Sequence, residues 1–425
     1  MSVYRVGGNK SSQNVFPSVR PTLDLDFANS KTLDPRITFT RASGGSYVGA
    51  DGLIKYAGVN EARFDHDPST GESLGLLIEE SRSNLFTSSV PQEGVWASTN
   101  NTLISNSEIA PDGTQRATLI DSDDTASVSH YIILNSPLTT ATTYTQTFFV
   151  KAGTTRFVQI APSTGFELTF ANFELRDDGI IGTYNVYGAS IQRFPNGWYR
   201  IGVTQTSTST VGGGRMILVL GTALTDARLP QPHTSRLSCY VWGAQLEVGA
   251  FPTSYIPTEG STRTRAADSA SITGKNFSEW YRQDEGTIYV SQKLKSIATV
   301  DRNSLVYLIN GGSGSGNDIF YNVKKGDTNI FVFGDNGTNY SRWQENGDST
   351  DTKAIWAYDV SGDDFKPYWN GIEGINEPNS SSPSATSHTQ LEIGATSNDK
   401  YNGHISKLTY YPRRLTNAQL QALTK

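Results

Sequence analysis

Acidic and histidine side chains, which can bind metals or transfer protons, come together at Asp65-His66-Asp67. A helix–loop–helix calcium site needs glycine at its sixth position and glutamate at its twelfth. Counted from Asp65, those positions hold Thr70 and Leu76, so the calcium motif is absent. We therefore interpret the cluster as a turn between two strands, and we expect neither a metal site nor any other cofactor.

Hydrolytic chemistry has few sequence signals. Glycosidases need two carboxyl groups that face each other across the scissile bond. No spacing forces together any two of the available acids, which are Asp24, Asp26, Glu79, Glu80, Glu167 and Glu392. The glycine runs at 212–214 and 311–316 lack the lysine of a phosphate-binding loop. We expect no catalytic residues and no enzyme activity, and a polysaccharide depolymerase ranks last among the alternatives.

Aromatic residues beside polar ones point instead to binding. An aromatic face can cover the apolar side of a sugar ring while nearby amide or charged groups bond its hydroxyls. Trp343 and Trp369 lie in polar, turn-rich surroundings, and core packing is the open alternative for both. The complete set of carbohydrate-binding candidates is Trp343, Trp369, Asn339, Arg342, Asn317 and Asp318.

The composition favours β-structure. The chain of 425 residues has 18% charged residues, below the roughly 25% of typical soluble domains. Glycine and aromatic residues are abundant, and aromatic residues suit pleated sheets. A net charge of −6 argues against nucleic acid as a partner. The single cysteine, Cys239, excludes an intrachain disulfide, and no apolar run is long enough to span a membrane.

The elements that would position these residues fall into five segments. Residues 1–21 are a polar arm, and 22–86 form a short β-module in which Leu23, Leu25 and Phe27 alternate with acids. Residues 87–258 are predicted as a first antiparallel sandwich of the carbohydrate-binding-module type. A linker at 259–269 then leads to a second antiparallel sandwich at 270–425.

Three local patterns in these domains make sharper predictions. Over residues 198–206, one face of a strand should carry Tyr199, Ile201 and Val203, and the other Trp198, Arg200 and Gly202. Asn370-Gly371 predicts a tight hairpin. Thr416 followed by Gln419 predicts the start of one C-terminal helix. The expected fold class is therefore all-β, with two antiparallel sandwiches of jelly-roll or lectin type, a short N-terminal module and one closing helix.

Several long phrases carry a resemblance to bacteriophage head-spike and tail-fibre proteins. They are LDLDFANSKTLDPRITFTRAS (23–43), ARFDHDPSTGESLGLLIEESRSNLF (62–86), WGAQLEVGAFPTSYIPTEGSTRTRAAD (242–268) and NGHISKLTYYPRRLTNAQLQALT (402–424). The last resembles the closing strand and helix of concanavalin-like or laminin-G-like sandwiches in such proteins, which implies that type for residues 270–425. The resemblance supplies no catalytic residues, and it leaves open a calcium ion in a loop of the second sandwich. Arg63 and Asp65 are expected to hold the N-terminal module together.

The resemblance implies a virion protein that is made in the host cytoplasm and carried on the particle surface. We expect it to bind a host surface glycan or other receptor, and to contact other virion proteins through its N-terminal segment. The expected assembly is a homo-oligomer, with a trimer ranked first and a pentamer second. A purely structural decoration or connector protein is the main alternative, and it predicts that Trp343 and Trp369 are buried or lie at subunit contacts.

Overall fold

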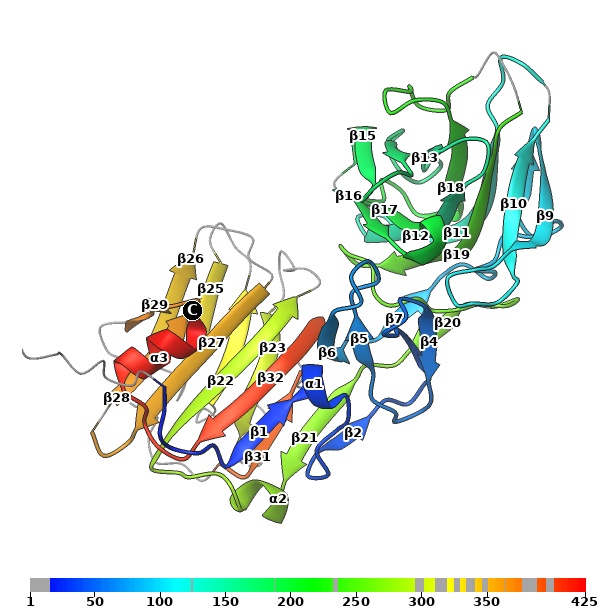
Figure 1. The fold of residues 1–425 in the computed structure, drawn as a ribbon. Coiled ribbons are helices and arrows are strands. Elements are labelled where there is room, and N and C mark those ends of the chain that lie inside the picture. Colours follow the sequence, from blue (N-terminus) through cyan, green and yellow to red (C-terminus); the bar gives the residue numbers. More distant parts are fainter. Residues whose placement is uncertain are drawn as a thin grey trace, which may run out of the picture.

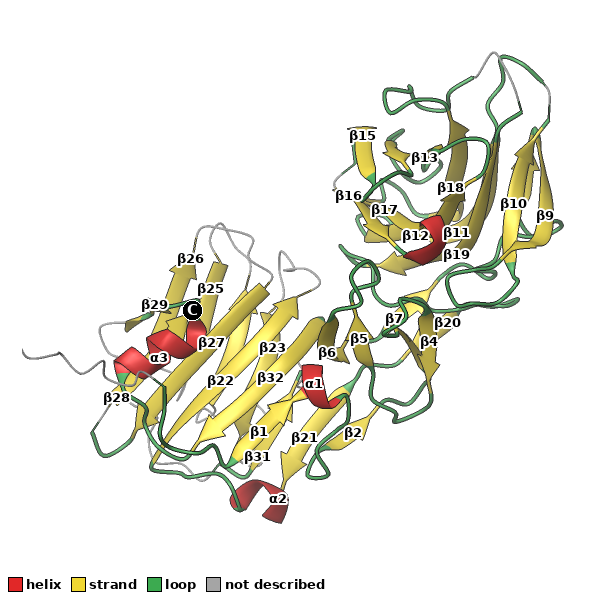
Figure 2. Cartoon of the chain, viewed as in Figure 1, coloured by secondary structure: helices red, strands yellow, loops and turns green. Residues whose placement is uncertain are grey.

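The computed structural model describes residues 16–123, 125–186, 188–231, 236–294, 302–309, 319–324, 329–333, 341–345, 351–362, 364–376, 388–394 and 401–425. Nearly all of its regular structure is antiparallel β-sheet, which confirms the predicted fold class. Figure 1 shows two β-sandwiches joined by a narrow region of short strands, and Figure 2 shows how little helix accompanies them. No helix in the described residues is long and apolar enough to cross a membrane.

The first sandwich consists of two six-stranded sheets. One has the order β16-β17-β12-β19-β10-β9, with β16 Gly188–Arg193, β17 Trp198–Thr206, β12 Thr143–Ala152, β19 Ser238–Val248, β10 Ala117–Ser122 and β9 Asn101–Glu108. The other has the order β15-β14-β13-β18-β11-β8, with β15 Ile180–Tyr184, β14 Ala171–Glu174, β13 Phe157–Ile160, β18 Val211–Gly221, β11 Tyr131–Leu138 and β8 Ala97–Thr99. A short 3-10 helix, η1 Pro195–Gly197, connects β16 to β17.

The core of the first sandwich forms where the inner faces of these sheets meet. Tyr199, Ile201 and Val203 of β17 are buried in it, whereas Trp198 belongs to a separate cluster on the outer face. The predicted alternation along this strand is therefore confirmed. Its consequence is that the outer face of the same sheet can carry polar groups such as Arg200.

The second sandwich consists of two eight-stranded sheets. One has the order β29-β28-β27-β22-β32-β6-β5 with β1 also paired to β32; its bounds are β29 Ile372–Glu373, β28 Asp364–Trp369, β27 Asp351–Asp359, β22 Glu285–Leu294, β32 Gly403–Tyr411, β6 Ser73–Ile78, β5 Phe64–His66 and β1 Leu23–Asp26. The other has the order β2-β21-β31-β23-β24-β25-β26-β30, with β2 Thr38–Thr40, β21 Ser269–Thr273, β31 Gln390–Ile393, β23 Arg302–Ile309, β24 Ile319–Lys324, β25 Asn329–Phe333, β26 Ser341–Glu345 and β30 Ile375–Asn376.

Four strands of this second sandwich come from the N-terminal segment. β1, β5 and β6 join one sheet and β2 joins the other, so residues 22–86 do not form the separate module that the sequence predicted. The predicted alternation within β1 is confirmed, since Leu23 and Leu25 are buried in the core of the second sandwich. A strand's pattern fixes which side chains point inward, but it does not identify the strand with which it pairs.

Three helices accompany the second sandwich: α1 Phe27–Ser30, α2 Lys275–Ser278 and α3 Asn417–Thr424. The C-terminal helix α3 begins at the predicted cap, where Thr416 and Gln419 form a reciprocal capping box. Leu415 and Leu420 pack with Ile355 of β27 in a cluster on the outer face of the sheet. The helix therefore covers a sheet face, as Figure 1 also shows.

Short paired strands occupy the region between the sandwiches. Hairpin β3–β4 (Gly45–Val48 and Ile54–Ala57) and the pair β7–β20 (Arg82–Asn84 and Arg263–Arg265) both lie there (Figure 1). The predicted linker 259–269 thus contains a strand. Residues 260–264 are exposed, but Arg265 and Asp268 are buried.

Buried ion pairs hold this junction together. Asp268 pairs with Arg41 at 3.0 Å and also with Arg63, while Arg63 pairs with Glu79 at 2.8 Å. Glu79 in turn accepts hydrogen bonds from the backbone N–H and hydroxyl of Ser254, at 2.8 and 2.6 Å. Because these residues come from the N-terminal segment, the first sandwich and the linker, the network connects all three. The expected structural role of Arg63 agrees with this arrangement.

Candidate ligand-binding site

A cavity of about 420 Å³ lies where the two sandwiches meet. Its walls come from the outer face of β12, β16 and β17, from hairpin β3–β4, from residues 65–68 and 252–255, and from Lys293 and His404 of the second sandwich. Both sandwiches therefore contribute to one site. Junctions of this kind are frequent positions for ligand sites, and typical ligand pockets have volumes of roughly 300–1,000 Å³.

The wall from the first sandwich is a row of three side chains on neighbouring strands. Gln192 lies directly opposite Arg200, and Arg200 lies directly opposite Phe149. Successive side chains of a strand point to opposite faces, so all three project from the outer face of the sheet. Ser190 and Thr147 line the cavity from the same face.

An aromatic cluster supports this wall. Phe149 makes edge-to-face contacts with Phe194, at 5.1 Å between ring centroids, and with Trp242, at 5.4 Å. Tyr255 packs against Trp242 at 4.5 Å and also lines the cavity. Aromatic pairs in these geometries are worth about 0.5–1.5 kcal/mol each beyond their buried area. The cluster therefore gives the cavity a rigid apolar floor.

Arg200 extends over this floor. Its guanidinium carbon lies 5.4 Å from the centroid of the Phe149 ring. One terminal nitrogen donates to the Thr253 carbonyl oxygen at 2.8 Å, and the other donates to the Thr147 hydroxyl at 3.2 Å. Burial lowers the pKa of the Arg200 guanidinium. The side chain is thus fixed in place by neutral acceptors and an aromatic ring.

The opposite wall contains two histidines and an aspartate. His404 Nε2 lies 2.7 Å from Asp65 Oδ2, and the backbone N–H of Val48 donates to Asp65 Oδ1 at 2.6 Å. His66 Nδ1 lies 3.0 Å from the Val48 carbonyl oxygen. Both histidines are only 5% exposed, and His66 Nε2 and His404 Nδ1 have no hydrogen-bond partner. These two ring nitrogens are therefore buried beside the cavity without a partner in the protein.

The predicted turn at Asp65-His66-Asp67 is correct only for Asp67. Asp65 and His66 belong to β5, whereas Asp67 accepts hydrogen bonds from the backbone of Ser69 and Thr70 in the turn that follows. Burial acts to raise the pKa of Asp67, but these hydrogen bonds outweigh it and lower the pKa. Among the residues that the structure describes, no group of three or more His, Cys, Asp or Glu side chains could hold a metal ion.

The sequence reading missed two features of this region. Asp65 contacts His404, which lies 339 positions away in the sequence, and no local pattern predicts such a contact. The phrase GESLG at 71–75 also fits the G-x-S-x-G spacing of a nucleophile elbow. However, Ser73 begins the antiparallel strand β6 and pairs with His66, whereas an elbow needs a turn from strand to helix.

Of the carbohydrate-binding residues predicted from sequence, Trp369 alone has a side chain in the described part of the structure, and it does not line this cavity. Trp369 is 1% exposed and lies inside the core of the second sandwich, so its predicted role as a sugar platform is wrong. Trp343 and Arg342 lie in β26, where they pair with Phe331 and Val332 of β25. The side chains of Trp343 and Arg342 lie outside the described part of the structure, as do residues Asn317, Asp318 and Asn339.

Comparisons with known proteins show likeness of architecture alone. No protein-family model and no curated protein sequence matches the chain. Among solved structures, the CBM40 of the Ruminococcus gnavus IT-sialidase bound to α2,3-sialyllactose matches 33% of this chain and 83% of its own, with 16% identity and a TM-score of 0.27. Domain 4 of AbnA, a GH43 extracellular arabinanase from Geobacillus stearothermophilus in complex with arabinotriose, matches 41% and 82%, with 12% identity and a TM-score of 0.28.

A third solved structure extends over more of the chain. Domains LG4–5 of the mouse laminin α1 chain match 78% of this chain and 89% of their own, with 10% identity and a TM-score of 0.24. Two of these three neighbours hold a sugar. Identities and scores this low carry no argument about what the chain binds, so its function is argued from the residues of the site.

Proposed function

We propose that the protein is a surface component of a phage virion, a head spike or a tail fibre, that binds host surface polysaccharide. The resemblance of several long phrases to such proteins supports the virion role, and the antiparallel sandwich architecture suits it. In this proposal the N-terminal segment contacts other virion proteins and the sandwiches face the host. The protein acts as a homo-oligomer, with a trimer ranked before a pentamer, because several copies raise the effective concentration of weak sites.

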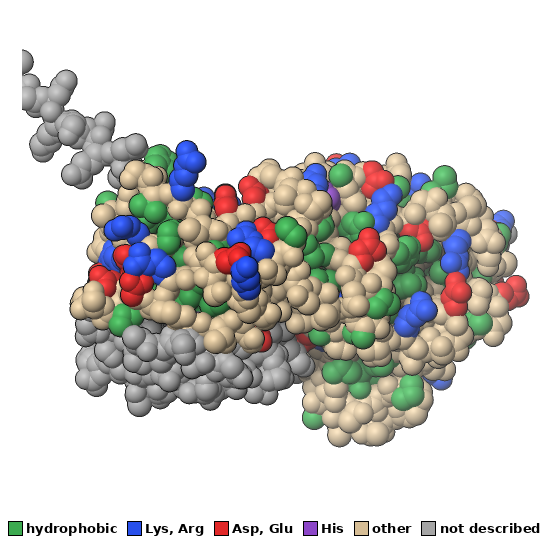
Figure 3. Space-filling view, turned by 90° about the horizontal axis from the view of Figure 1, so that it is seen from below, with side chains coloured by type: hydrophobic (Ala, Val, Ile, Leu, Met, Phe, Trp, Pro, Cys, Tyr) green, Lys and Arg blue, Asp and Glu red, His purple; other side chains and the backbone are tan. Residues whose placement is uncertain are grey.

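The observation that carries the proposal is the junction cavity. It combines an aromatic floor around Phe149 with the polar side chains of Gln192 and Arg200 and with the unpartnered ring nitrogens of His66 and His404. A pyranose ring presents an apolar face and a rim of hydroxyls, and this lining suits both. On the face seen in Figure 3, basic and acidic side chains are interspersed, which suits a sugar better than a polyanionic phosphate backbone.

Binding without hydrolysis is part of the proposal. Both carboxylates that line the cavity have bonds within the protein: Asp65 with His404 and Asp67 with the following turn. A glycosidase needs one acid free to donate a proton and a second free to attack or to activate water. A reducing-sugar assay on the bound polysaccharide should therefore stay at background level.

A glycan array probed with the oligomeric full-length chain tests the proposal. We expect binding to a defined set of bacterial polysaccharides. The substitution Ser190→Trp should reduce it at least ten-fold, because Ser190 lines the cavity from an exposed position where a large ring would occupy the space. Failure of the wild-type chain to bind any polysaccharide would contradict the proposal.

A structural connector protein is the second candidate, and the burial of Trp369 favours it. The ion-pair network at the junction also suits a rigid spacer. Such a protein would bind no glycan, and loss of the junction cavity would leave virion attachment to host cells unchanged. Virions that carry the Ser190→Trp protein distinguish the two functions, because only the glycan-binding protein predicts weaker attachment.

A further inference from the structure

The charged residues that line the junction cavity differ in their partners: the carboxylates have bonds within the protein, whereas the cations form no ion pair in the part of the chain that the structure describes. Four of its lining residues carry a formal charge at neutral pH: Arg200, Lys293, Asp65 and Asp67. Both carboxylates are satisfied inside the protein, Asp65 by Val48 N–H and His404, and Asp67 by the N–H groups of its turn. Within the described residues, neither Arg200 nor Lys293 forms an ion pair. The unsatisfied charge that faces the cavity is therefore positive.

Arg200 is the more informative of the two cations. It is partly buried, and the acceptors that fix it are a carbonyl oxygen and a hydroxyl, both neutral. The buried carboxylates of Glu247 and Glu79 attract its charge from a distance, but neither forms an ion pair with it. Two of the five N–H groups of an arginine are occupied by these bonds. A guanidinium removed from water without an acidic partner is costly. By contrast, the arginines buried at the nearby junction, Arg41 and Arg63, both have carboxylate partners.

The other residues that line the cavity suit a sugar that carries an anionic group able to pair with Arg200. A planar guanidinium matches a carboxylate better than a lysine ammonium does, because it can donate two parallel hydrogen bonds. Gln192 lies beside Arg200 on the neighbouring strand and can bond hydroxyls. The unpartnered nitrogens of His66 and His404 offer further partners on the opposite wall, and both side chains are more than nine-tenths buried.

We propose that the junction cavity binds an acidic sugar, with the ligand carboxylate on Arg200 and its hydroxyls on Gln192 and the two histidines. Lys293, which is exposed at the rim, adds long-range attraction for the anion. The inference rests on the proposed glycan-binding function and narrows its ligand to the carboxylate-bearing class.

The test compares sugars that differ only at C6. Glucuronate, galacturonate and mannuronate are titrated into the full-length chain beside glucose, galactose and mannose, and binding is followed by ligand-observed NMR. We expect at least one hexuronate to bind at least ten-fold more tightly than its parent hexose. Arg200→Gln should abolish that preference, and Arg200→Lys should retain part of it. Lys293→Gln should weaken hexuronate binding only a few-fold.

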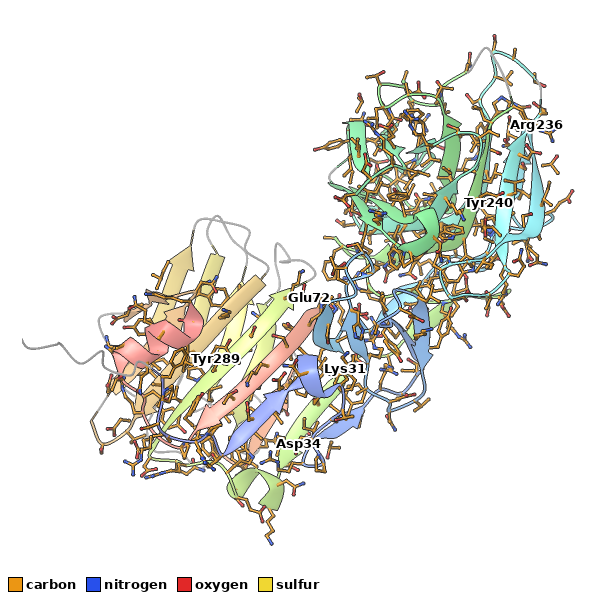
Figure 4. The ribbon with its side chains drawn as sticks, viewed as in Figure 1. Lys31, Asp34, Glu72, Arg236, Tyr240 and Tyr289 are labelled. Atoms are coloured by element: carbon orange, nitrogen blue, oxygen red, sulfur yellow. The ribbon has the colours of Figure 1, made fainter. Side chains whose placement is uncertain are left out.

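Arg236→Gln is the matched control. Arg236 is an exposed arginine of the same sandwich, and Figure 4 shows it at the end remote from the second sandwich. Its substitution should leave the preference unchanged. Because Arg200→Gln removes buried bonds and could lower stability, Ser190→Trp provides a second variant at an exposed position. It should remove hexuronate binding while its melting temperature stays within a few degrees of wild type.

Several results would overturn the inference. If no hexuronate binds more tightly than its parent hexose, or if Arg200→Gln leaves the preference intact, the cavity is not an acidic-sugar site. Polysaccharide binding on the array that is limited to neutral glycans would reject the inference while the proposed function stands. If the wild-type chain binds neither the simple sugars nor any arrayed glycan, both the inference and the proposed function fail.

Discussion

At the scale of single residues, the junction depends on charges that are buried and fully paired. Asp268 alone accepts from Arg41, from Arg63 and from the backbone N–H of Glu79. Such a cluster contributes modestly to stability as a whole, because desolvation offsets attraction, but removal of one member leaves the others unpaired. The positions of Asp268 and Glu79 therefore constrain how the two sandwiches meet, and with it the shape of the cavity.

The substitution Asp268→Asn should lower the free energy of unfolding by about 3–5 kcal/mol, because buried Arg41 loses its carboxylate partner and buried Arg63 keeps only Glu79. Urea denaturation followed by fluorescence measures the loss. Asp51→Asn is the control, since the pair of Asp51 with Lys55 is exposed and such pairs contribute less than about 1 kcal/mol. Equal losses for the two variants would show that the buried network has no special role.

Buried tyrosines set a limit to stability at high pH. Burial raises the pKa of Tyr410 to about 12, and its hydroxyl bonds the carbonyl oxygens of Arg282 and Glu285. Because the folded-state pKa lies above the usual value near 10, the stabilisation from Tyr410 is complete below pH 10 and is lost as the pH rises toward 12. A shift of about two units corresponds to roughly 2–3 kcal/mol.

Denaturation at pH 8 to 12 of wild type and Tyr410→Phe measures this dependence. The advantage of the wild-type protein over the variant should shrink as the pH rises from 10 to 12. Tyr184→Phe, at an exposed side chain, should follow wild type at every pH. An advantage that stays constant or grows above pH 10 would contradict the assignment.

At the scale of elements, local chemistry in the sequence predicted several features correctly. The alternation along β17 placed Arg200 on the outer face of its sheet, and that face became the cavity wall. Asn370-Gly371 forms the predicted turn between β28 and β29, and both residues have positive φ angles, of 42° and 81°. Each of these features is decided by neighbours within a few positions, which is why the sequence alone could reveal it.

The helix cap gives a prediction at the same scale. Thr416→Ala should destabilise the protein by about 0.5–2 kcal/mol, because the hydroxyl of Thr416 accepts from the backbone N–H of Gln419 at the start of α3. Thermal denaturation checks it. Thr416→Ser keeps the hydroxyl and should retain most of the stability; a serine variant as unstable as the alanine variant would show that the cap bond is not the cause.

The pairing of strands that lie far apart in the chain could not be predicted from the sequence. β1 pairs with β32 although nearly 400 positions separate Asp24 from Thr409, so the first strands of the chain complete the sheet of the last domain. Trp369 illustrates the same limit for the site. Trp369 comes directly before the polar turn Asn370-Gly371 yet points into the core, because strand pairing decides which face of β28 is inside. The cavity is lined by segments that lie far apart in the sequence, and no local motif predicts that they come together.

At the scale of the whole molecule, the arrangement explains why a site would form between the sandwiches. The N-terminal strands complete the second sandwich and then supply hairpin β3–β4 to the junction, and the linker returns to the same place. Buried ion pairs fix that meeting point and leave beside it a cavity with an aromatic floor and polar walls. In the proposed virion protein, the same rigid joint would hold the site open at the particle surface.

The most direct test of the central claim is a crystal structure of the full-length chain with the tightest-binding glycan from the array. The account predicts sugar density in the junction cavity, above Phe149 and between Arg200 and His404. Glycan density on either sandwich away from the junction, with the cavity empty, would contradict it.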